Sequence, residues 1–179
     1  MSWIKTLKND YSTILESLLV PNEYYDSITE IELAYHSQKG FDTLILDIDN
    51  TLITYEEKEL SLQYYNWIQS AKLLGFKLYL ISNNSKPRRM KHVFDQLKLT
   101  GLYFACKPFT FSTKEFMIDN AIDPSKTIVI GDQLFKDVIL GNWLQSYTIL
   151  VKPMSLAGVF FQTIQFEFEK YLLRKFGVI

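Results

Sequence analysis

Short apolar runs that alternate with helical patterns constrain the fold of this chain more than any other feature of its sequence. Five such runs stand out, over residues 43–47, 76–81, 102–105, 127–131 and 147–151. Runs of this length and apolarity are typical of strands that are buried on both faces of a parallel sheet. Because helical stretches separate them, the sequence predicts a Rossmann-like three-layer α/β fold with a five-stranded, mainly parallel sheet.

The helical stretches between these runs carry their own start and stop signals. Ser61 is a favourable N-cap for a helix that ends near Gly75, and Ser112 with Glu115 has the spacing of a capping box. Apolar residues at helical spacing predict further helices over 1–20, 90–97, 135–144 and 159–175. We expect one domain over 1–179, with the first and last helices packed on the sheet or peripheral to it.

The composition narrows the classes of function. Nineteen basic residues against twenty acidic ones give a net charge of -1, which argues against a nucleic-acid partner. A single cysteine, Cys106, and two histidines, His36 and His92, leave no internal disulfide and no Cys/His metal site, so we expect a reducing compartment. No apolar run reaches the roughly 20 residues that span a bilayer, and residues 1–5 lack the pattern of a secretory leader. We therefore expect a cytoplasmic protein, either free or peripheral on the inner face of a membrane.

Polar side chains of complementary chemistry follow the first four runs. They are Asp47, Asp49, Asn50 and Thr51 after the first run, Ser82, Asn83 and Asn84 after the second, Lys107 after the third, and Asp132 followed by Asp137 after the fourth. In an open parallel sheet, ligands bind in the crevice outside the carboxyl ends of the strands. Clustered carboxylates suit Mg²⁺, and a lysine in the same crevice suits an anionic substrate. The set predicts a site for phosphoryl transfer.

Each of these loops also has a purely structural interpretation. Asp47 and Asp49 can end a strand in an Asx turn, residues 82–84 have a common loop composition, and a lysine is solvated by default. We favour the functional interpretation because four separate loops at one sheet edge carry chemistry that fits one phosphate group.

Residues 47–51, Asp-Ile-Asp-Asn-Thr, resemble the D-x-D-x-T signature of the haloacid dehalogenase (HAD) superfamily phosphatases, and the other three loops resemble its remaining motifs in the right order. The resemblance implies that Asp47 is a nucleophile that forms an aspartyl-phosphate, and that Asp49 is the general acid/base. It also implies Mg²⁺ as the cofactor, held by Asp47, Asp132 and the backbone carbonyl of Asp49. Asp137 is then an outer-shell partner of the metal.

The same resemblance assigns the groups that bind phosphate. Thr51, Ser82 and Asn83 hold the substrate and its phosphoryl oxygens, and Lys107 neutralises charge on the nucleophile and the phosphate. The intervals from Asp49 to Ser82 and from there to Lys107 each hold only one helix and one strand, without the cap domain that many relatives insert. The fold is therefore expected to be capless, with a site that is open to large substrates or covered by a second subunit of a homo-oligomer.

A closer resemblance extends over most of the chain. Residues 18–24, 49–52, 131–134 and 147–151 resemble the HAD subfamily IIIA group called YqeG-like, which is similar to the mitochondrial phosphatidylglycerophosphate phosphatases. This implies dephosphorylation of phosphatidylglycerophosphate, an anionic phospholipid, to phosphatidylglycerol. Lys136 and Trp143 replace that group's usual threonine and arginine, so a soluble nucleotide or sugar phosphate stays an alternative substrate. A non-catalytic phosphate-binding or interaction domain is the alternative from another class.

The ends of the chain and one pair of arginines leave further alternatives open. Aromatic and basic residues in 1–20 and 159–175 fit either peripheral membrane contact or packing on the sheet or on a second subunit. Arg88 and Arg89 either reach a second phosphate of the substrate or form a solvated helix face.

Overall fold

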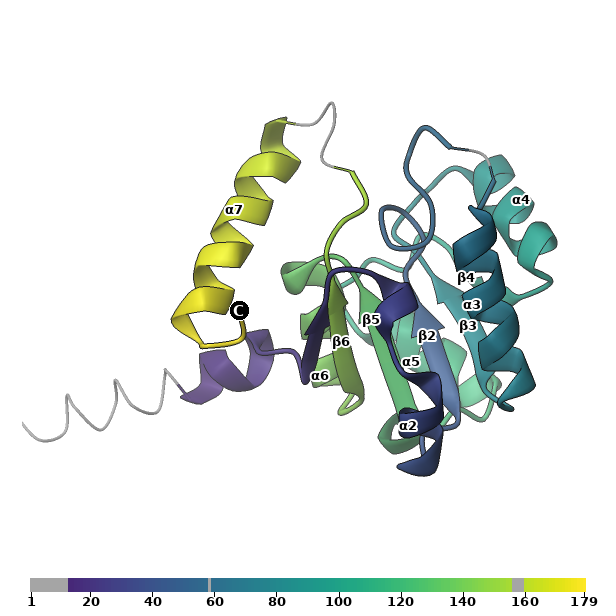
Figure 1. Ribbon diagram of the computed structural model, residues 1–179, viewed down its shortest axis with the longest axis horizontal. Helices are drawn as coiled ribbons and strands as arrows, with labels where there is room; N and C mark the ends of the chain where they lie inside the picture. Colours follow the sequence, from purple (N-terminus) through teal and green to yellow (C-terminus); the bar gives the residue numbers. More distant parts are fainter. Residues whose placement is uncertain (1–12, 58, 156–159) are drawn as a thin grey trace, which may run out of the picture.

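The computed structural model describes residues 13–57, 59–155 and 160–179. Within them, six parallel strands form one sheet in the order β1-β6-β5-β2-β3-β4 (Figure 1). Their bounds are β1 Glu23–Tyr25, β2 Thr43–Leu46, β3 Lys77–Ile81, β4 Thr100–Leu102, β5 Thr127–Gly131 and β6 Tyr147–Val151. Helices pack on both faces of this sheet, which confirms the predicted Rossmann-like three-layer α/β fold.

β1 corrects the predicted number of strands from five to six. It pairs in parallel with β6, so that Glu23 lies opposite Ile149. The strand is three residues long, it lies at the edge of the sheet, and all of its residues are only partly buried. Its Glu-Tyr-Tyr sequence therefore lacks the apolar run that reveals the buried strands.

Helices and shorter helical turns connect the strands. Their bounds are η1 Ile28–Glu30, α2 Leu33–Gln38, α3 Leu62–Leu73, α4 Pro87–Leu97, α5 Phe111–Asp119, η2 Pro124–Lys126, η3 Leu134–Val138, α6 Ile139–Trp143 and α7 Phe160–Lys175. η1 and η2 are 3-10 helices, η3 is a π-helix, and residues 13–19 form a further helical segment. Each crossover between parallel strands thus contains at least one helix, as parallel pairing requires.

Apolar side chains cover both faces of the sheet. On one face, Leu44 and Leu46 of β2 pack with residues of η1, α2, α3 and α4, which include Ile68 and Met90. On the other face, Ile45 packs with residues of α5 and α6. All four residues of β2 are buried, as a strand that is covered on both faces requires.

Sequence signals locate the start of α3 but not the ends of β4. Ser61 caps α3 as predicted, because its side chain accepts a hydrogen bond of 3.5 Å from Tyr64 N. The sequence predicts the third strand over 102–105, whereas β4 is Thr100–Leu102. Its register with the last three residues of β3 decides these bounds, and the apolar residues beyond Leu102 belong to the loop that carries Lys107.

The next two helices begin differently from the prediction. The capping box predicted at Ser112 is wrong, because α5 begins at Phe111 and no side chain caps it. Thr110, at the N-cap position, already has helical backbone angles, so Ser112 lies inside the first turn. The helix predicted over 135–144 begins as the π-helix η3 and continues as α6. η3 contains Asp137, so its wider turn helps to set where the carboxylate of this residue lies in the site.

The C-terminal helix packs beside the sheet. α7 runs along the side of the molecule nearest β1 and β6 (Figure 1). Its Leu173 is buried in a cluster with Leu19, Leu134 and Leu150. Residues 1–12 of the predicted N-terminal helix lie outside the described residues. In the described ranges, every helix is too short or too polar to cross a membrane.

Candidate active site

A cavity of about 200 Å³ lies at the carboxyl ends of the strands. Asp47 directly follows β2, Ser82 follows β3, Asp132 follows β5, and Lys107 lies on the loop after β4. The cavity is lined by Asp47, Asp49, Tyr55, Ser82, Asn83, Asn84, Lys107, Gln133, Lys136 and Asp137. The structure therefore brings together side chains from all four loops that the sequence singles out.

Lys107 joins two of the carboxylates. Its ammonium donates hydrogen bonds to Asp47 Oδ1 at 2.5 Å, to Asp137 Oδ1 at 2.6 Å and to the backbone carbonyl of Ile81 at 3.0 Å. The side chain is almost completely buried. Burial lowers the pKa of Lys107, but the charges of Asp137 and Asp47 outweigh burial and raise this pKa above its ordinary value. Lys107 therefore stays positively charged at neutral pH, as neutralisation of a phosphate requires.

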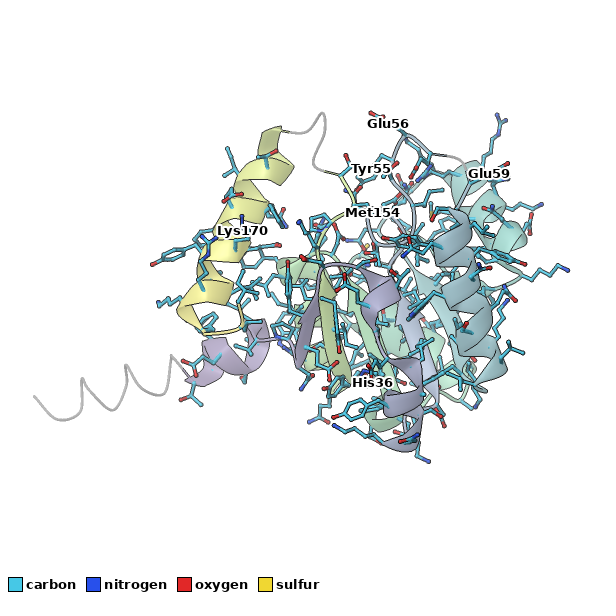
Figure 2. The ribbon with its side chains drawn as sticks, viewed as in Figure 1. His36, Tyr55, Glu56, Glu59, Met154 and Lys170 are labelled. Carbon is cyan, nitrogen blue, oxygen red and sulfur yellow. The ribbon has the colours of Figure 1, made fainter. Side chains whose placement is uncertain are left out.

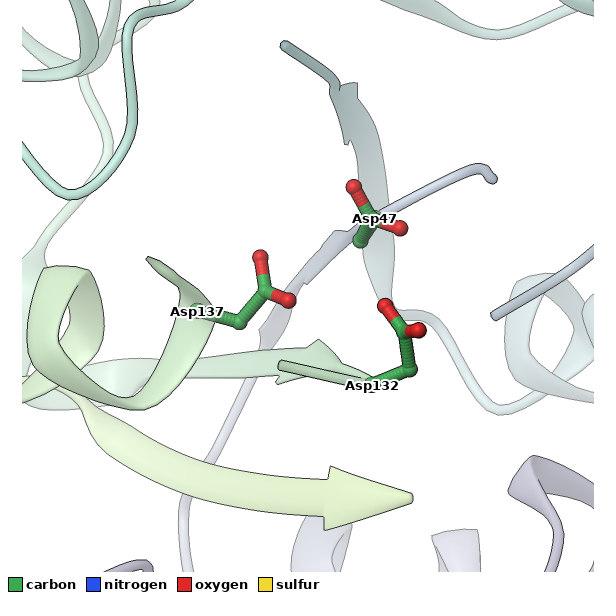
Figure 3. Close-up of side chains that lie close together, drawn as sticks. All are labelled: Asp47, Asp132 and Asp137. Carbon is green, nitrogen blue, oxygen red and sulfur yellow. The ribbon is translucent and has the colours of Figure 1, made fainter. Parts of the chain in front are cut away.

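Asp47 and Asp137, the two partners of this lysine, lie close to a third carboxylate, that of Asp132, as Figure 3 shows. Ligand oxygens of Asp47, Asp132 and Asp137 lie within 4.8 Å of one another, and all three residues are buried. Burial raises the pKa of Asp47 to about 6 against the opposing charge of Lys107, and Asp137 adds to the rise. Burial and the charges of Asp47 and Asp137 raise the pKa of Asp132 well above its usual range. One ammonium cannot balance three ionised carboxylates, so without a further cation Asp47 and Asp132 hold protons more readily than free aspartates do.

A hard divalent cation fits this cluster. Asp47 Oδ2 is buried and has no hydrogen-bond partner among the described residues. Mg²⁺ prefers carboxylate oxygens as ligands, and its charge would offset the mutual repulsion of these carboxylates. Asp47 and Asp132 are predicted to hold the metal, together with the backbone carbonyl of Asp49. Asp137, predicted as an outer-shell partner, lies in the same cluster and contacts Lys107 directly.

The position of Asp137 depends on the local backbone. Gln133 N, at the start of the π-helix η3, donates a hydrogen bond of 3.0 Å to Asp137 Oδ2. A Cβ atom at Gly131, the last residue of β5, would overlap the carboxyl group of Asp137. The lack of a side chain at this position therefore makes room for the carboxylate that Lys107 binds.

Thr51 supports the cluster from the loop after β2. Asn50 has a φ of 66°, and its backbone N–H donates to Ile53 O at 2.8 Å, so the chain turns tightly after Asp49. The hydroxyl of Thr51, which is buried, donates a long hydrogen bond of 3.5 Å to Asp132 Oδ1. Thr51 is predicted to bind substrate or phosphate, and in the structure it contacts a carboxylate of the candidate metal cluster instead of the cavity.

The loop after β3 carries two residues that are predicted to hold phosphoryl oxygens. Ser82 is buried and lines the cavity, and its Oγ accepts a hydrogen bond of 3.0 Å from Asn84 N. The amide of Asn83 accepts a hydrogen bond of 2.6 Å from Lys107 N and donates one of 2.8 Å to Lys107 O. The side chain of Asn83 therefore fixes the backbone of the residue that binds Asp47.

Asp49 is held by two residues whose contact with it the sequence did not predict. Arg89 donates two hydrogen bonds to Asp49 Oδ1, at 3.0 and 3.2 Å, and Asn84 donates one of 2.8 Å to Oδ2. Of the two alternatives for Arg88 and Arg89, the solvated face holds for Arg88, which is exposed, whereas Arg89 forms an ion pair with Asp49. Helical spacing separates the two arginines, because Arg89 lies four residues before the buried Val93, at the edge of the stripe that faces the core, whereas Arg88 lies on the opposite side of α4. Asn84 belongs to the polar residues that the sequence singles out, because it directly follows Ser82 and Asn83.

The two departures from the YqeG-like pattern lie in different places. Lys136 lines the cavity and is partly buried. Trp143 is the last residue of α6, is 45% exposed and is not among the residues that line the cavity. The residue at 136 therefore changes the chemistry of the cavity wall, where it adds a positive charge.

Known proteins resemble this chain in sequence. The pattern of the family described as mitochondrial PGP phosphatase, where PGP is phosphatidylglycerophosphate, matches residues 4–154. The chain belongs to this family. It is also similar to the probable phosphatase YqeG of Bacillus subtilis (strain 168), with 28% identity over 160 residues, which cover 89% of this chain and 92% of that protein. These matches confirm the YqeG-like resemblance.

Two solved structures are similar in fold to this member of the PGP phosphatase family. An uncharacterized protein from Listeria monocytogenes serotype 4b has a TM-score of 0.53 and 15% identity, over 71% of this chain and 99% of that one. The cobalt-bound deoxy-D-mannose-octulosonate 8-phosphate phosphatase (YrbI) from Haemophilus influenzae has a TM-score of 0.52 and 14% identity, over 78% of this chain and 91% of that one. At these identities the similarity shows the fold alone. The family and the relative establish a phosphatase, which is a phosphomonoester hydrolase, and the fold agrees with the resemblance to the HAD superfamily.

Proposed function

We propose that this phosphatase hydrolyses the terminal phosphomonoester of phosphatidylglycerophosphate to give phosphatidylglycerol, in a Mg²⁺-dependent reaction through an aspartyl-phosphate on Asp47. The observation that carries the reaction is the buried Asp47 carboxylate, which Lys107 holds beside Asp132 and Asp137. The substrate rests on the family, whose pattern matches residues 4–154.

Asp47 begins the proposed reaction as the nucleophile. An oxygen of its carboxylate attacks phosphorus, so that an O–P bond to Asp47 forms while the P–O bond to the glycerol oxygen breaks. Lys107 donates a hydrogen bond to this carboxylate, so it holds the nucleophile in place and offsets negative charge as it gathers. Asp49, which lines the same cavity, gives its proton to the departing glycerol oxygen.

Water completes the reaction. It attacks the phosphorus of the aspartyl-phosphate, the bond to Asp47 breaks, and Asp49 takes up the proton that the water loses. Inorganic phosphate leaves, and both aspartates return to their starting states. When bound, Mg²⁺ supplies positive charge that offsets the charge of the carboxylates and of the phosphoryl group.

An open site supports a large, membrane-embedded substrate. Between β2 and α3, and between β3 and α4, the described residues hold one isolated bridge from Asp49 to Ile53 and no further helix or strand. A site without a cap lets a headgroup reach Asp47 while the acyl chains stay in the bilayer, which avoids a cost of about 0.8 kcal/mol per CH₂ group extracted. Lys136 on the cavity wall offers a positive charge to the phosphodiester that this lipid carries beside its terminal phosphate.

Peripheral contact with anionic lipid is part of the proposal, and α7 supports it. Ile164, Phe168 and Tyr171 lie at helical spacing on α7, and each is more than half exposed. Lys170, labelled in Figure 2, and Arg174 add positive charge on the same helix. The cytoplasmic location, the lack of a nucleic-acid partner and the homo-oligomer stay predictions from the sequence.

Two alternatives differ in what the cavity would bind. A soluble nucleotide or sugar phosphate is the alternative substrate, because a second phosphate of such a molecule would meet the same Lys136. A non-catalytic phosphate-binding domain is the less favoured alternative, because a binding module has no need for two aspartates and a lysine in the arrangement of Asp47, Asp49 and Lys107.

A ranking of substrates tests the proposed function. We expect kcat/KM for phosphatidylglycerophosphate in mixed micelles to exceed that for para-nitrophenyl phosphate and mononucleotides by about tenfold or more, because the larger substrate supplies additional binding energy at the transition state. Turnover should require Mg²⁺ and disappear in excess chelator. Preference for a nucleotide or sugar phosphate by the same factor would refute the lipid substrate, and full activity in chelator would refute the metal-dependent mechanism.

A further inference from the structure

The guanidinium of Arg89 joins Asp49, which lines the cavity, to the loop over residues 54–57. From α4 it donates to Asp49 Oδ1 through Nε at 3.2 Å and through Nη2 at 3.0 Å. Nη2 also donates to Thr54 O at 2.7 Å, and Nη1 donates to Glu57 O at 2.8 Å. The side chain of Arg89 is 17% exposed and that of Asp49 is 7% exposed, so the ion pair is largely shielded from water. Replacing these hydrogen bonds by contacts with water would therefore cost more free energy than it does at an exposed ion pair.

These contacts distinguish the two oxygens of Asp49. Oδ1 accepts two hydrogen bonds from a permanent cation, whereas Oδ2 accepts one from the neutral amide of Asn84. A proton on Oδ1 would lie against the guanidinium of Arg89, which has donors only. A proton on Oδ2 meets no such cation, and that oxygen keeps a lone pair beside the amide. Oδ2 is therefore the oxygen that is left to exchange a proton with a leaving group or with water.

The same guanidinium holds the loop that forms one wall of the cavity. The carboxylate of Glu57 accepts hydrogen bonds from Thr54 N at 3.1 Å and from Thr54 Oγ1 at 2.8 Å, which closes the loop on itself. Both residues then offer their backbone carbonyls to Arg89. Tyr55, between them, lines the cavity and is labelled in Figure 2. Asp49 and this wall are thus fixed by one side chain.

We propose that Arg89 is a positioning residue for proton transfer, which anchors Asp49 through Oδ1 and leaves Oδ2 to serve the leaving oxygen of the substrate. This inference rests on the proposed aspartyl-phosphate reaction but not on the lipid, because every alkyl phosphomonoester releases an alcohol that needs a proton. An aryl ester such as para-nitrophenyl phosphate needs little help from an acid, because nitrophenolate is a stable anion. Loss of Arg89 therefore slows an alkyl ester far more than an aryl ester.

The test compares Arg89→Gln with Arg88→Gln, its exposed neighbour on α4. The esters are para-nitrophenyl phosphate and whichever of glycerol 3-phosphate and micellar phosphatidylglycerophosphate the unchanged protein turns over faster. The readout is kcat/KM, which reports every step through departure of the leaving group. Arg89→Gln should lower kcat/KM about 100-fold for the alkyl ester and about threefold or less for the aryl ester. Arg88→Gln should leave both values unchanged.

A lysine at position 89 sharpens the test. Lysine supplies a point charge but lacks the planar fork that reaches Asp49 and two carbonyls at once. Arg89→Lys should therefore recover about tenfold of the lost alkyl-ester activity. Equal losses on the two esters in folded Arg89→Gln would overturn the inference; if that variant does not fold, an unchanged ratio of the two esters in Arg89→Lys would do so. The proposed function fails separately, if Asp47→Asn keeps its activity on both esters.

Discussion

Two buried clusters of ionisable side chains lie at opposite ends of the sheet. At the carboxyl ends of the strands, Lys107 binds Asp47 and Asp137 beside an open cavity. Near the amino ends of β1 and β6, His36 Nε2 lies 3.2 Å from Glu23 Oε2, and both members of this pair are largely buried. Figure 2 shows His36 at the lower end of the sheet, away from Tyr55, which lines the cavity.

The surroundings of the two clusters differ. Glu23 also accepts hydrogen bonds from the hydroxyl groups of Tyr147 at 2.7 Å and Tyr25 at 2.9 Å. The ring of His36 contacts three other aromatic rings, those of Tyr35, Phe41 and Tyr147. Aromatic packing thus closes the space at this end, whereas at the other end three carboxylates face one ammonium beside a cavity. Burial of ionisable groups is common to both clusters, and the unbalanced charge beside open space is what distinguishes the site.

The largest expected effect is a loss of turnover when the cluster at the carboxyl ends of the strands is changed. Asp47→Asn should lower turnover by about 10⁴-fold or more, because it removes the nucleophile. The free energy of unfolding of the metal-free protein should not fall, because the substitution removes a carboxylate whose ionisation the buried cluster disfavours. Steady-state kinetics and urea unfolding measure the two quantities. Near wild-type turnover in a preparation free of other phosphatases would show that Asp47 is not the nucleophile.

A smaller effect tests the charge balance at the carboxyl end. Lys107→Met keeps most of the side-chain volume but leaves Asp47 and Asp137 without their cation. The free energy of unfolding in chelator should fall by about 3–5 kcal/mol, which is the cost of removing one partner of a buried ion pair while the other stays buried. Saturating Mg²⁺ should restore part of this loss, because a bound cation replaces part of the missing charge. A loss below about 1 kcal/mol would contradict the ion pairs as the structure has them.

The smallest expected effect lies at the other end of the sheet. His36→Ala should leave kcat/KM unchanged and cost about 2–3 kcal/mol of stability near neutral pH, because a buried ring loses its packing. Burial lowers the pKa of His36 below its ordinary value of 6.5, although Glu23 opposes this shift, so the neutral ring stabilises the fold. This contribution is complete above about pH 6.5 and is lost as the pH falls through the lowered pKa. Urea unfolding at several pH values should show the deficit of His36→Ala shrinking on acidification, and a deficit that grows would be the opposite of this expectation.

The buried strands could be predicted from the sequence, whereas of the two partly buried edge strands β4 was predicted with shifted bounds and β1 was not predicted. β2 and β5 are wholly buried, so each of their residues had to be apolar or small, and the runs stand out. The three residues of β1 are partly buried at the edge of the sheet. Glu23 contacts His36 and accepts hydrogen bonds from two tyrosine hydroxyls instead of packing in the core. The predicted start of α5 was wrong because the backbone is already helical at Thr110, before the serine that was expected to cap the helix.

The residues of the site could be predicted where the chain itself places them at a strand end. Asp47 and Asp132 directly follow β2 and β5, so the topology alone brings them together. The contacts of Asn83 and Arg89 depend on how loops and a helix lie in three dimensions. No local pattern says that the Asn83 amide binds the backbone of Lys107, or that Arg89 reaches Asp49.

Gly131 has a consequence for how chains with this site are recognised from sequence alone. Since only the lack of a side chain at 131 lets the carboxylate of Asp137 lie over the end of β5, the two positions act as one unit. A chain that kept the first motif around Asp47 but had alanine at 131 would look like a phosphatase, yet it would have no room for the second partner of Lys107. A search pattern that requires glycine and aspartate at these two positions together is therefore a stricter criterion for this site than the first motif on its own.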